Sequence, residues 1–415
     1  MVRSGNRVGR IGVHRVMRTR LLALVCGVLM LAGCGSASSP GVAGSAKPRP
    51  APPITASRGC PAAHVFFPFS AGALTGIQFV SPAQGWAVGL EQILATTDGG
   101  QRWTVQRSGR LNLTSVDFVS GQAGWAVGTS TLLATSDGGA HWAALPEPCP
   151  LIRSVHFISP ETGFAVAGGT NVLDIGPVTP GIAGVILATS DGGHSWRRLP
   201  SPADAQTVCF SDPLDGWLGA DGRLYRTTDG GRSWVQAAAG VAPASAGDPA
   251  TMIVQCAGPG SAWALDVGPG AAMSQEPHVG YHAGPAGTGP IFAEQYFPNP
   301  GLGVRANSPG AYAGPFSAIS PSVAVFIDGC PACGGVGTAP WDLVTRSGTV
   351  LTPKGNVPGL NQPMAASFLS PQLGWVVGIA ISSSGTGQVR QQQRIVFTDD
   401  GGRTWHVQYA SPPSG

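Results

Sequence analysis

The sequence predicts an all-β protein: a seven-bladed β-propeller built from four-stranded antiparallel blades. Three observations lead to this prediction. An eight-residue phrase occurs five times, an apolar phrase precedes it by about ten residues, and two pairs of neighbouring units stand 39 residues (Asp98 to Asp137) and 38 residues (Asp191 to Asp229) apart. Each unit contains four short runs rich in Val, Phe, Trp and Thr, which are too short for helices and typical of strands. Four strands in about forty residues make one propeller blade.

The recurring phrase reads Thr, any residue, Asp, Gly, Gly, two free positions and Trp. The chain must reverse between the third and fourth strands of a blade, and Gly-Gly supplies the positive φ angles for that turn. The Asp side chain can accept backbone N–H groups across the turn, and the Trp buries a large surface. We therefore expect structural rather than catalytic roles for the five Asp and Trp pairs, which are Asp98 and Trp103, Asp137 and Trp142, Asp191 and Trp196, Asp229 and Trp234, and Asp400 and Trp405.

The apolar phrase begins as Gly-Trp-Ala-Val-Gly and becomes looser along the chain. Its copies start at Gly85, Gly124, Gly163, Gly216 and Gly374, with degenerate versions at Ala262 and Val323. Seven copies between about residues 75 and 410 predict seven blades. The competing folds are a β-sandwich array and a β-helix, and β-helix repeats are usually shorter than these.

The two phrases carry a resemblance to known families. The Thr-x-Asp-Gly-Gly-x-x-Trp phrase resembles the Asp-box, or BNR repeat, of sialidase-like and sortilin-like propellers. Together with the Gly-Trp-Ala-Val-Gly phrase, the unit is similar to the photosystem II stability/assembly factor-like (WD40/YVTN/BNR-like) propellers. The resemblance covers about residues 75–409. It implies the fold, but propellers host many unrelated activities, so it implies little about the ligand.

The N-terminus predicts export. Residues 21–33 form an apolar stretch behind Arg15, Arg18 and Arg20, which has the length of a signal-peptide core. It ends in Leu-Ala-Gly-Cys, which resembles a bacterial lipobox with Cys34 as the lipidated residue. The competing interpretation is an ordinary signal peptide that contains a cysteine, and the true start is either Met1 or Met17. We expect a signal peptide over 1–33, a flexible tether over 34–58 and the propeller over 59–415.

The charge balance argues against a nucleic-acid partner. The formal charge is +3, but six arginines and no acid precede Cys34, which leaves 18 basic and 21 acidic residues in the mature chain. A mature chain with so small a net charge does not favour binding to a strongly anionic partner such as a nucleic acid. We expect a monomer that contacts the membrane through its lipid and binds an envelope protein or a glycan.

The six cysteines after Cys34 predict disulfides, because an even count is usual in exported proteins. Six cysteines allow fifteen pairings, and the sequence does not choose among them. Cys330 and Cys333 form a Cys-Pro-Ala-Cys motif that fits either a local disulfide or a redox pair. The surrounding Gly-rich sequence has no βαβ unit, so a structural loop closure is favoured.

Long connections follow several second strands, over residues 167–184, 266–277, 328–340 and 379–393, and residues 298–315 link blades five and six. All are expected on the face opposite the Asp-boxes, where long loops on a rigid scaffold favour a binding surface. Blade five lacks an Asp-box and carries the densest group of glutamate, histidine and tyrosine side chains in the chain. We expect a polar-aromatic binding patch there, made by Glu276, His278, Tyr281, His282, Glu294 and Tyr296.

Two function classes remain open. One is a non-enzymatic binding or assembly module, and the other is a carbohydrate-active hydrolase, either sialidase-like or another glycosidase. The sequence contains no Arg-Ile-Pro, Gly-x-Ser-x-Gly or His-Glu-x-x-His motif, and no phosphate loop. His278 and His282 would stand about 13 Å apart on a strand, too far to share one metal. We expect no catalytic residue, no metal and no cofactor, although a pair of carboxylates in the channel would favour the hydrolase.

Overall fold

A computed structural model of the chain describes residues 72–168, 184–239, 251–268, 278–285, 287–294, 313–327, 338–345, 355–383 and 389–413. All of them lie in the compact unit Ala51–Gly415. The expected signal peptide and tether, the predicted lipidation site Cys34, and the Cys330–Cys333 motif lie outside the described residues.

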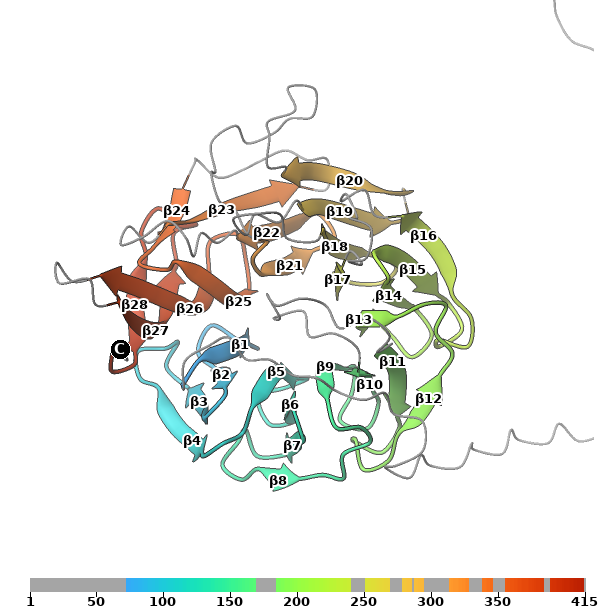
Figure 1. The fold of residues 1–415 in the computed structure, drawn as a ribbon, viewed down its shortest axis with the longest axis horizontal. Coiled ribbons are helices and arrows are strands. Elements are labelled where there is room, and N and C mark those ends of the chain that lie inside the picture. Colours follow the sequence, from blue (N-terminus) through green and yellow to red (C-terminus); the bar gives the residue numbers. More distant parts are fainter. Residues whose placement is uncertain are drawn as a thin grey trace, which may run out of the picture. The chain divides into compact units, whose positions relative to one another are not determined.

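The described residues form seven four-stranded sheets, each made of four strands consecutive in sequence. The sheets stand around a common centre, with the first strand of each sheet innermost (Figure 1). Within each sheet, neighbouring strands are antiparallel. The predicted all-β propeller of four-stranded antiparallel blades is confirmed, and we number the sheets as blades one to seven in chain order.

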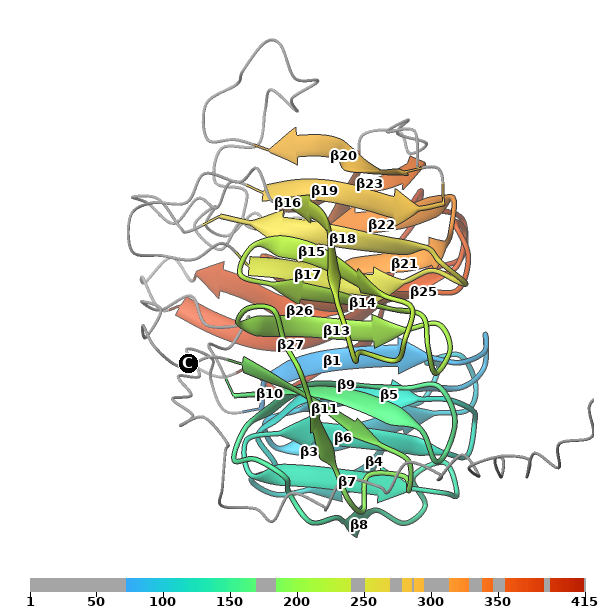
Figure 2. The same ribbon diagram turned by 90° about the vertical axis from the view of Figure 1, so that its right-hand side faces the viewer.

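The strand bounds follow the repeat. Blades one to four contain β1 (Leu74–Phe79), β2 (Gly85–Gly89), β3 (Gln92–Thr96), β4 (Thr104–Ser108), β5 (Leu113–Phe118), β6 (Gly124–Gly128), β7 (Thr131–Thr135), β8 (Ala143–Ala144), β9 (Ile152–Phe157), β10 (Gly163–Gly168), β11 (Gly184–Thr189), β12 (Arg197–Leu199), β13 (Ala205–Phe210), β14 (Gly216–Ala220), β15 (Arg223–Thr227) and β16 (Val235–Ala239). Blades five to seven contain β17 (Thr251–Cys256), β18 (Ala262–Val267), β19 (His278–Gly284), β20 (Gly287–Glu294), β21 (Phe316–Ser320), β22 (Val323–Ile327), β23 (Thr338–Thr345), β24 (Gly355–Pro358), β25 (Gln362–Phe368), β26 (Gly374–Ser383), β27 (Val389–Thr398) and β28 (His406–Ala410). The strands run across the thickness of the ring, so the turns lie at its two faces (Figure 2).

The first glycine of the apolar phrase makes room for an aromatic ring. A Cβ on Gly85 would lie 2.6 Å from the Phe79 ring, closer than any real contact. Phe79 ends the inner strand β1, and Gly85 lies opposite it at the start of β2. The glycine therefore allows the phenylalanine to lie flat across β2. The same close approach recurs at Gly124, Gly163, Gly216 and Gly374.

Neighbouring blades join through ring stacking and hydrogen bonds, and blades seven and one join in the same way. The Phe79 ring of β1 stacks on Trp375 of β26 with centroids 3.5 Å apart. The Phe79 N–H donates to Ser367 Oγ at 2.9 Å, and the Leu74 N–H donates to Gln393 Oε1 at 3.1 Å. Because β1–β4 and β25–β28 are separate sheets, these side-chain contacts bring the last blade against the first.

The prediction of a long loop over residues 379–393 is wrong. β26 and β27 are each ten residues long, and Ser383 pairs with Val389 at the end of the hairpin. The apolar residues Ile379 and Ile381 continue the alternation of β26 beyond its predicted end. This period of two favours strand over loop.

Candidate functional site

The Asp-box turns form one repeated hydrogen-bond network. Thr96 Oγ1 donates to Asp98 Oδ1 at 2.9 Å and accepts the Gly100 N–H at 2.8 Å. The Arg102 N–H also donates to Asp98 Oδ1, at 2.9 Å. Gly99 and Gly100 have φ angles of 74° and 90°, the left-handed region that favours glycine. The Thr, Asp and Gly-Gly positions therefore act together to close the turn.

These hydrogen bonds stabilise the ionised carboxylates. The backbone N–H of His141 is the main cause that lowers the pKa of Asp137 to about 2. The Ser233 hydroxyl is the main cause for Asp229, and the Thr404 backbone N–H for Asp400, and both pKa values fall to about 2. A carboxylate held in this way keeps its charge and is poorly suited to exchange protons at neutral pH.

The Asp-box tryptophans pack edge-on against the inner-strand phenylalanines. The Trp103 and Phe79 centroids are 5.8 Å apart with an interplanar angle of 87°. Equivalent pairs join Trp142 to Phe118, Trp196 to Phe157, Trp234 to Phe210 and Trp405 to Phe368. Each outermost turn is thus anchored to the inner strand of its own blade.

The structure describes only part of the binding patch that the sequence predicts in blade five. His278 and Tyr281 lie on β19 and are each 1% exposed, so both face the interior. His282 is partly exposed, and its Nε2 lies 2.9 Å from the Pro321 carbonyl oxygen. Glu294 ends β20, while Glu276 and Tyr296 lie outside the described residues. A binding patch at this position stays a prediction.

The inner strands are joined by a belt of side-chain links, most of them from the next-to-last residue of the strand. Gln78 Oε1 accepts the Phe118 N–H at 2.6 Å, and Asp117 Oδ2 accepts the Phe157 N–H at 2.5 Å. His156 Nε2 donates to the Phe210 carbonyl at 2.8 Å. The remaining links are the Cys209–Cys256 disulfide, Gln255 to Phe316 and Ala318, Ser317 to Phe368, and Ser367 to Phe79. One junction of the belt is therefore covalent.

The Cys209–Cys256 disulfide joins β13 to β17, and its Cα atoms are 5.6 Å apart. Cys149 is also disulfide-bonded. The expectation of disulfides is confirmed for these cysteines. The pairing was not predictable from the sequence, because it depends on which positions of neighbouring inner strands face each other.

Two carboxyls beside the inner strands, buried Asp117 and half-buried Asp204, have raised pKa values. Burial raises the pKa of Asp117, opposed by the His156 charge and the Phe157 N–H. Burial also raises the pKa of Asp204, whose carboxylate accepts the Gly184 N–H. Arg153 is buried beside Asp204 and donates to the Ala205 carbonyl at 2.7 Å. Burial lowers the Arg153 pKa to about 10. Asp204 and Arg153 therefore help to join blades three and four, whereas Asp117 joins blades two and three.

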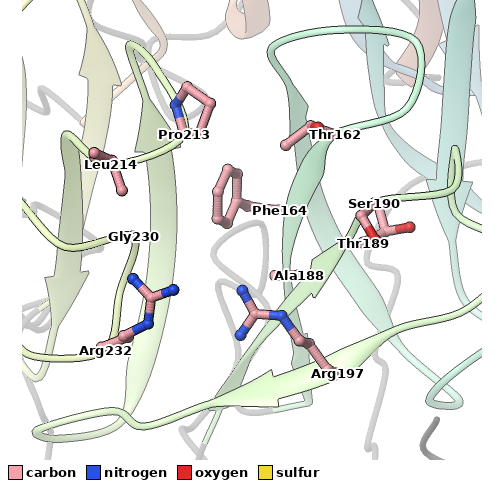
Figure 3. Close-up of a pocket in the computed structure, with 10 residues that line it drawn as sticks. All are labelled: Thr162, Phe164, Ala188, Thr189, Ser190, Arg197, Pro213, Leu214, Gly230 and Arg232. Atoms are coloured by element: carbon pink, nitrogen blue, oxygen red, sulfur yellow. The ribbon is translucent and has the colours of Figure 1, made fainter. Parts of the chain in front are cut away.

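A pocket of about 240 Å³ lies between blades three and four (Figure 3). The Phe164 ring forms part of its lining, and the guanidinium groups of Arg197 and Arg232 lie on one side of that ring. Its lining also includes Thr162, Ala188, Thr189, Ser190, Pro213, Leu214 and Gly230. Sequence reasoning missed this site. The available signal was Phe164, which interrupts the Gly-Trp pattern of the apolar phrase.

Within the ranges that the structure describes, no group of three or more His, Cys, Asp or Glu residues is arranged to hold a metal ion. No helix in the described part of the chain is long and apolar enough to cross a bilayer.

The fold and the repeated turn define the class of the protein, which is an Asp-box, or BNR-repeat, β-propeller. Residues 63–149 match the family model described as photosynthesis system II assembly factor YCF48. Over that segment the chain is similar to this family. No curated protein matches the chain.

Solved structures include propellers with different described roles. The GH74 enzyme of Niastella koreensis has a TM-score of 0.52 at 10% identity, covering 81% of this chain and 66% of that one. The chain thus spans less than two thirds of that structure's length. YCF48 from Cyanidioschyzon merolae has a TM-score of 0.44 at 17% identity, covering 71% of this chain and 84% of that one. At 10% identity, the likeness to the GH74 enzyme concerns the fold alone.

Proposed function

We propose that the chain is an exported, lipid-anchored propeller that acts as a non-enzymatic binding or assembly scaffold at the cell envelope. In this proposal the lipid on Cys34 and the tether 34–58 hold the propeller at the outer face of the cell membrane. Its partner is an envelope protein or a glycan. The family match over residues 63–149 supports the assembly role.

One observation carries the scaffold proposal: two carboxyls near the inner strands, buried Asp117 and half-buried Asp204, are used to join blades. Asp117 accepts a backbone N–H of β9, and Asp204 accepts the Gly184 N–H beside buried Arg153. A glycosidase needs two carboxyls about 5–10 Å apart that can exchange protons with the substrate. Asp117 and Asp204 instead form contacts between blades, which supports a structural role for these carboxyls rather than a catalytic one.

The belt of side-chain links also favours a fixed platform. Each junction of inner strands has a hydrogen bond or the Cys209–Cys256 disulfide. A rigid scaffold that presents loops is the common design of binding proteins. We infer that partners bind to turns on the faces of a ring that changes little in shape.

Labelling and cross-linking test this proposal. Cells that express the tagged full chain are labelled with radioactive palmitate, and partners are cross-linked in the envelope and identified. Cys34→Ser should lose the label, whereas Cys26→Ser, in the same apolar stretch, should keep it. Recovery of envelope proteins supports an assembly scaffold. Recovery of glycans alone contradicts the assembly role, and an unlabelled wild type contradicts the anchor.

The alternative is a carbohydrate-active hydrolase, and one pair of carboxyls favours it. Burial raises the Asp204 pKa, and the nearby Asp221 charge raises it further. Asp221 pairs with Arg223 at 2.7 Å. A carboxyl with a raised pKa beside a second carboxyl is the arrangement that a glycosidase uses. The full chain is assayed on a glycan panel with Asp204→Asn and Asp221→Asn as controls. A wild type without glycan cleavage contradicts this alternative.

A further inference from the structure

An indole N–H joins three pairs of neighbouring blades in the same way. Trp86 Nε1 donates to the Gly138 carbonyl at 3.1 Å, and Trp125 Nε1 donates to the Gly192 carbonyl at 2.9 Å. Trp375 Nε1 lies 3.4 Å from the Gly99 carbonyl. Each acceptor is the first glycine of an Asp-box in the next blade. The link therefore requires an indole in one blade and an Asp-box in the following blade.

The junction of blades three and four breaks this pattern. Phe164 stacks on Phe210 with centroids 3.5 Å apart, as Trp125 stacks on Phe157 at 3.4 Å. A phenyl ring has no N–H, and it is smaller than indole. Within the described residues, no side chain donates to the Gly230 carbonyl. The pocket lies at this place, lined by both Phe164 and Gly230.

A second substitution removes another donor at the same junction. In blade one, Gln106 Nε2 donates to the Gly138 carbonyl at 2.9 Å. A Cβ built on Gly139 would meet Gln106, whereas a Cβ built on Gly231 would meet Leu199. Leu199 therefore takes the place of the glutamine and has no group to donate. The Gly230 acceptor and the space beside it result from two changes in the repeat.

Two positive charges complete the site. Arg197 leads β12 and Arg232 follows Gly231, and both guanidinium groups point toward the Phe164 ring (Figure 3). None of the ion pairs in the described ranges includes either arginine, and Arg232 Nη1 donates to the Asp229 carbonyl at 2.7 Å. Burial lowers the pKa of Arg197, and the like charge of Arg232 lowers it further. Two cations that repel each other are stabilised by an anion placed between them.

We propose that this pocket binds a compact aromatic acid, with its carboxylate on Arg197 and Arg232, its ring on Phe164 and a ring N–H or O–H on the Gly230 carbonyl. The ligand lies beside Phe164 and reaches the Gly230 carbonyl, whereas at three other junctions the indole N–H of a tryptophan reaches the equivalent carbonyl. Arginine favours carboxylates because its planar group donates two parallel hydrogen bonds. This small-molecule site is separate from the scaffold role and stands without it.

The size of the pocket limits the ligand. Pockets for drug-sized ligands have volumes of about 300–1,000 Å³, so 240 Å³ holds a single ring system with a short acidic arm. The apolar side formed by Phe164 and Leu214 favours a ring over inorganic phosphate. We expect a dissociation constant of about 1 mM for a ligand of about 13 heavy atoms at ordinary ligand efficiency.

The test uses three probes on the full chain in a neutral detergent. Binding of indole-3-acetate, indole-3-acetamide and inorganic phosphate is measured by saturation-transfer NMR. The acetate should bind about fivefold more tightly than the neutral amide, since the arginines keep part of their exposure to water. Phosphate binding as tight as that of indole-3-acetate contradicts the aromatic ligand, and equal binding of acetate and amide contradicts the arginine contact.

Three variants locate the site. Arg232→Ala should remove the preference for the acetate, whereas Arg403→Ala, at the same Asp-box position in blade seven, should keep it. Phe164→Trp should fill the pocket, restore the indole link to Gly230 and abolish binding, without loss of thermal stability. This variant keeps both arginines, so it separates the pocket from charge alone. Full binding by Phe164→Trp, or equal losses in Arg232→Ala and Arg403→Ala, overturns the proposal.

Discussion

The indole Nε1 of Trp125 donates a hydrogen bond to the Gly192 carbonyl, which joins blade two to the Asp-box of blade three. The same tryptophan stacks on Phe157 of blade three. One side chain thus contacts both the inner strand and the outer turn of the next blade. The repeat phrase places the tryptophan and its acceptor in different units, so the motif encodes the junction as well as the blade.

We predict that Trp125→Phe lowers the free energy of unfolding by about 1 kcal/mol more than a change in ring size alone, because the half-buried Gly192 carbonyl loses its donor. Chemical denaturation of the full chain measures this change. Trp217→Phe is the matched control, since Trp217 Nε1 has no hydrogen-bond partner among the described residues. If both variants lose the same stability, the hydrogen bond contributes nothing.

The Asp-box carboxylates predict a stability loss in acid. The folded pKa values of Asp137, Asp229 and Asp400 are about 2, below the ordinary value of 3.8. The ionised form is therefore favoured by folding, and its contribution is complete above about pH 4 and lost as the pH falls toward 2. Thermal unfolding between pH 2 and 5 should show a falling midpoint. A combined Asp→Asn variant of the three should show a shallower fall, and an unchanged slope would contradict this role.

The turn chemistry was predictable from the sequence because it is local. Thr96, Asp98 and Gly100 are linked by hydrogen bonds within five residues of the chain, and no distant contact is needed to fix their roles. The spacing of the units then predicts the blades. The extended β26–β27 hairpin was missed because its polar residues suggested a loop, although the apolar alternation continued through Ile381.

Contacts between blades were not predictable in this way. His278 and Tyr281 suggested a surface patch, but a blade is covered on both faces by its neighbours, so alternation along β19 places both residues inside. The Arg197 and Arg232 pocket depends on Phe164 of blade three facing Gly230 of blade four. A comparison of the seven apolar phrases shows the missing tryptophan, but only the three-dimensional arrangement shows what lies beside it.

The Cys209–Cys256 disulfide should stabilise the ring strongly. It joins residues 47 apart in sequence, and closing a loop of that length in the unfolded chain is worth about 4 kcal/mol in the chain-entropy model. We predict that the double variant Cys209→Ala/Cys256→Ala loses about 2–5 kcal/mol in denaturant unfolding under oxidising conditions. Ser367→Ala, which removes a hydrogen-bonded link of the belt, should lose much less. Equal losses of stability in the two variants would mean that the disulfide stabilises the fold no more than the Ser367 hydrogen bond does.

Asp117 predicts the opposite pH dependence from the Asp-boxes. Burial raises its folded pKa, so folding favours the protonated carboxyl, and its ionisation costs stability as the pH rises above the ordinary value of 3.8. Asp117→Asn keeps a carbonyl oxygen for the Phe157 N–H and removes the charge. We expect the variant and the wild type to have equal stability near pH 3, with the variant increasingly more stable toward pH 7. Thermal unfolding of both proteins across this range measures the difference.

Asp212→Asn is the control for this prediction. The exposed Asp212 carboxylate has a lowered pKa, so its substitution should give the opposite trend. A variant less stable than the wild type at pH 7 would mean that the charge itself, through His156, holds blades two and three together.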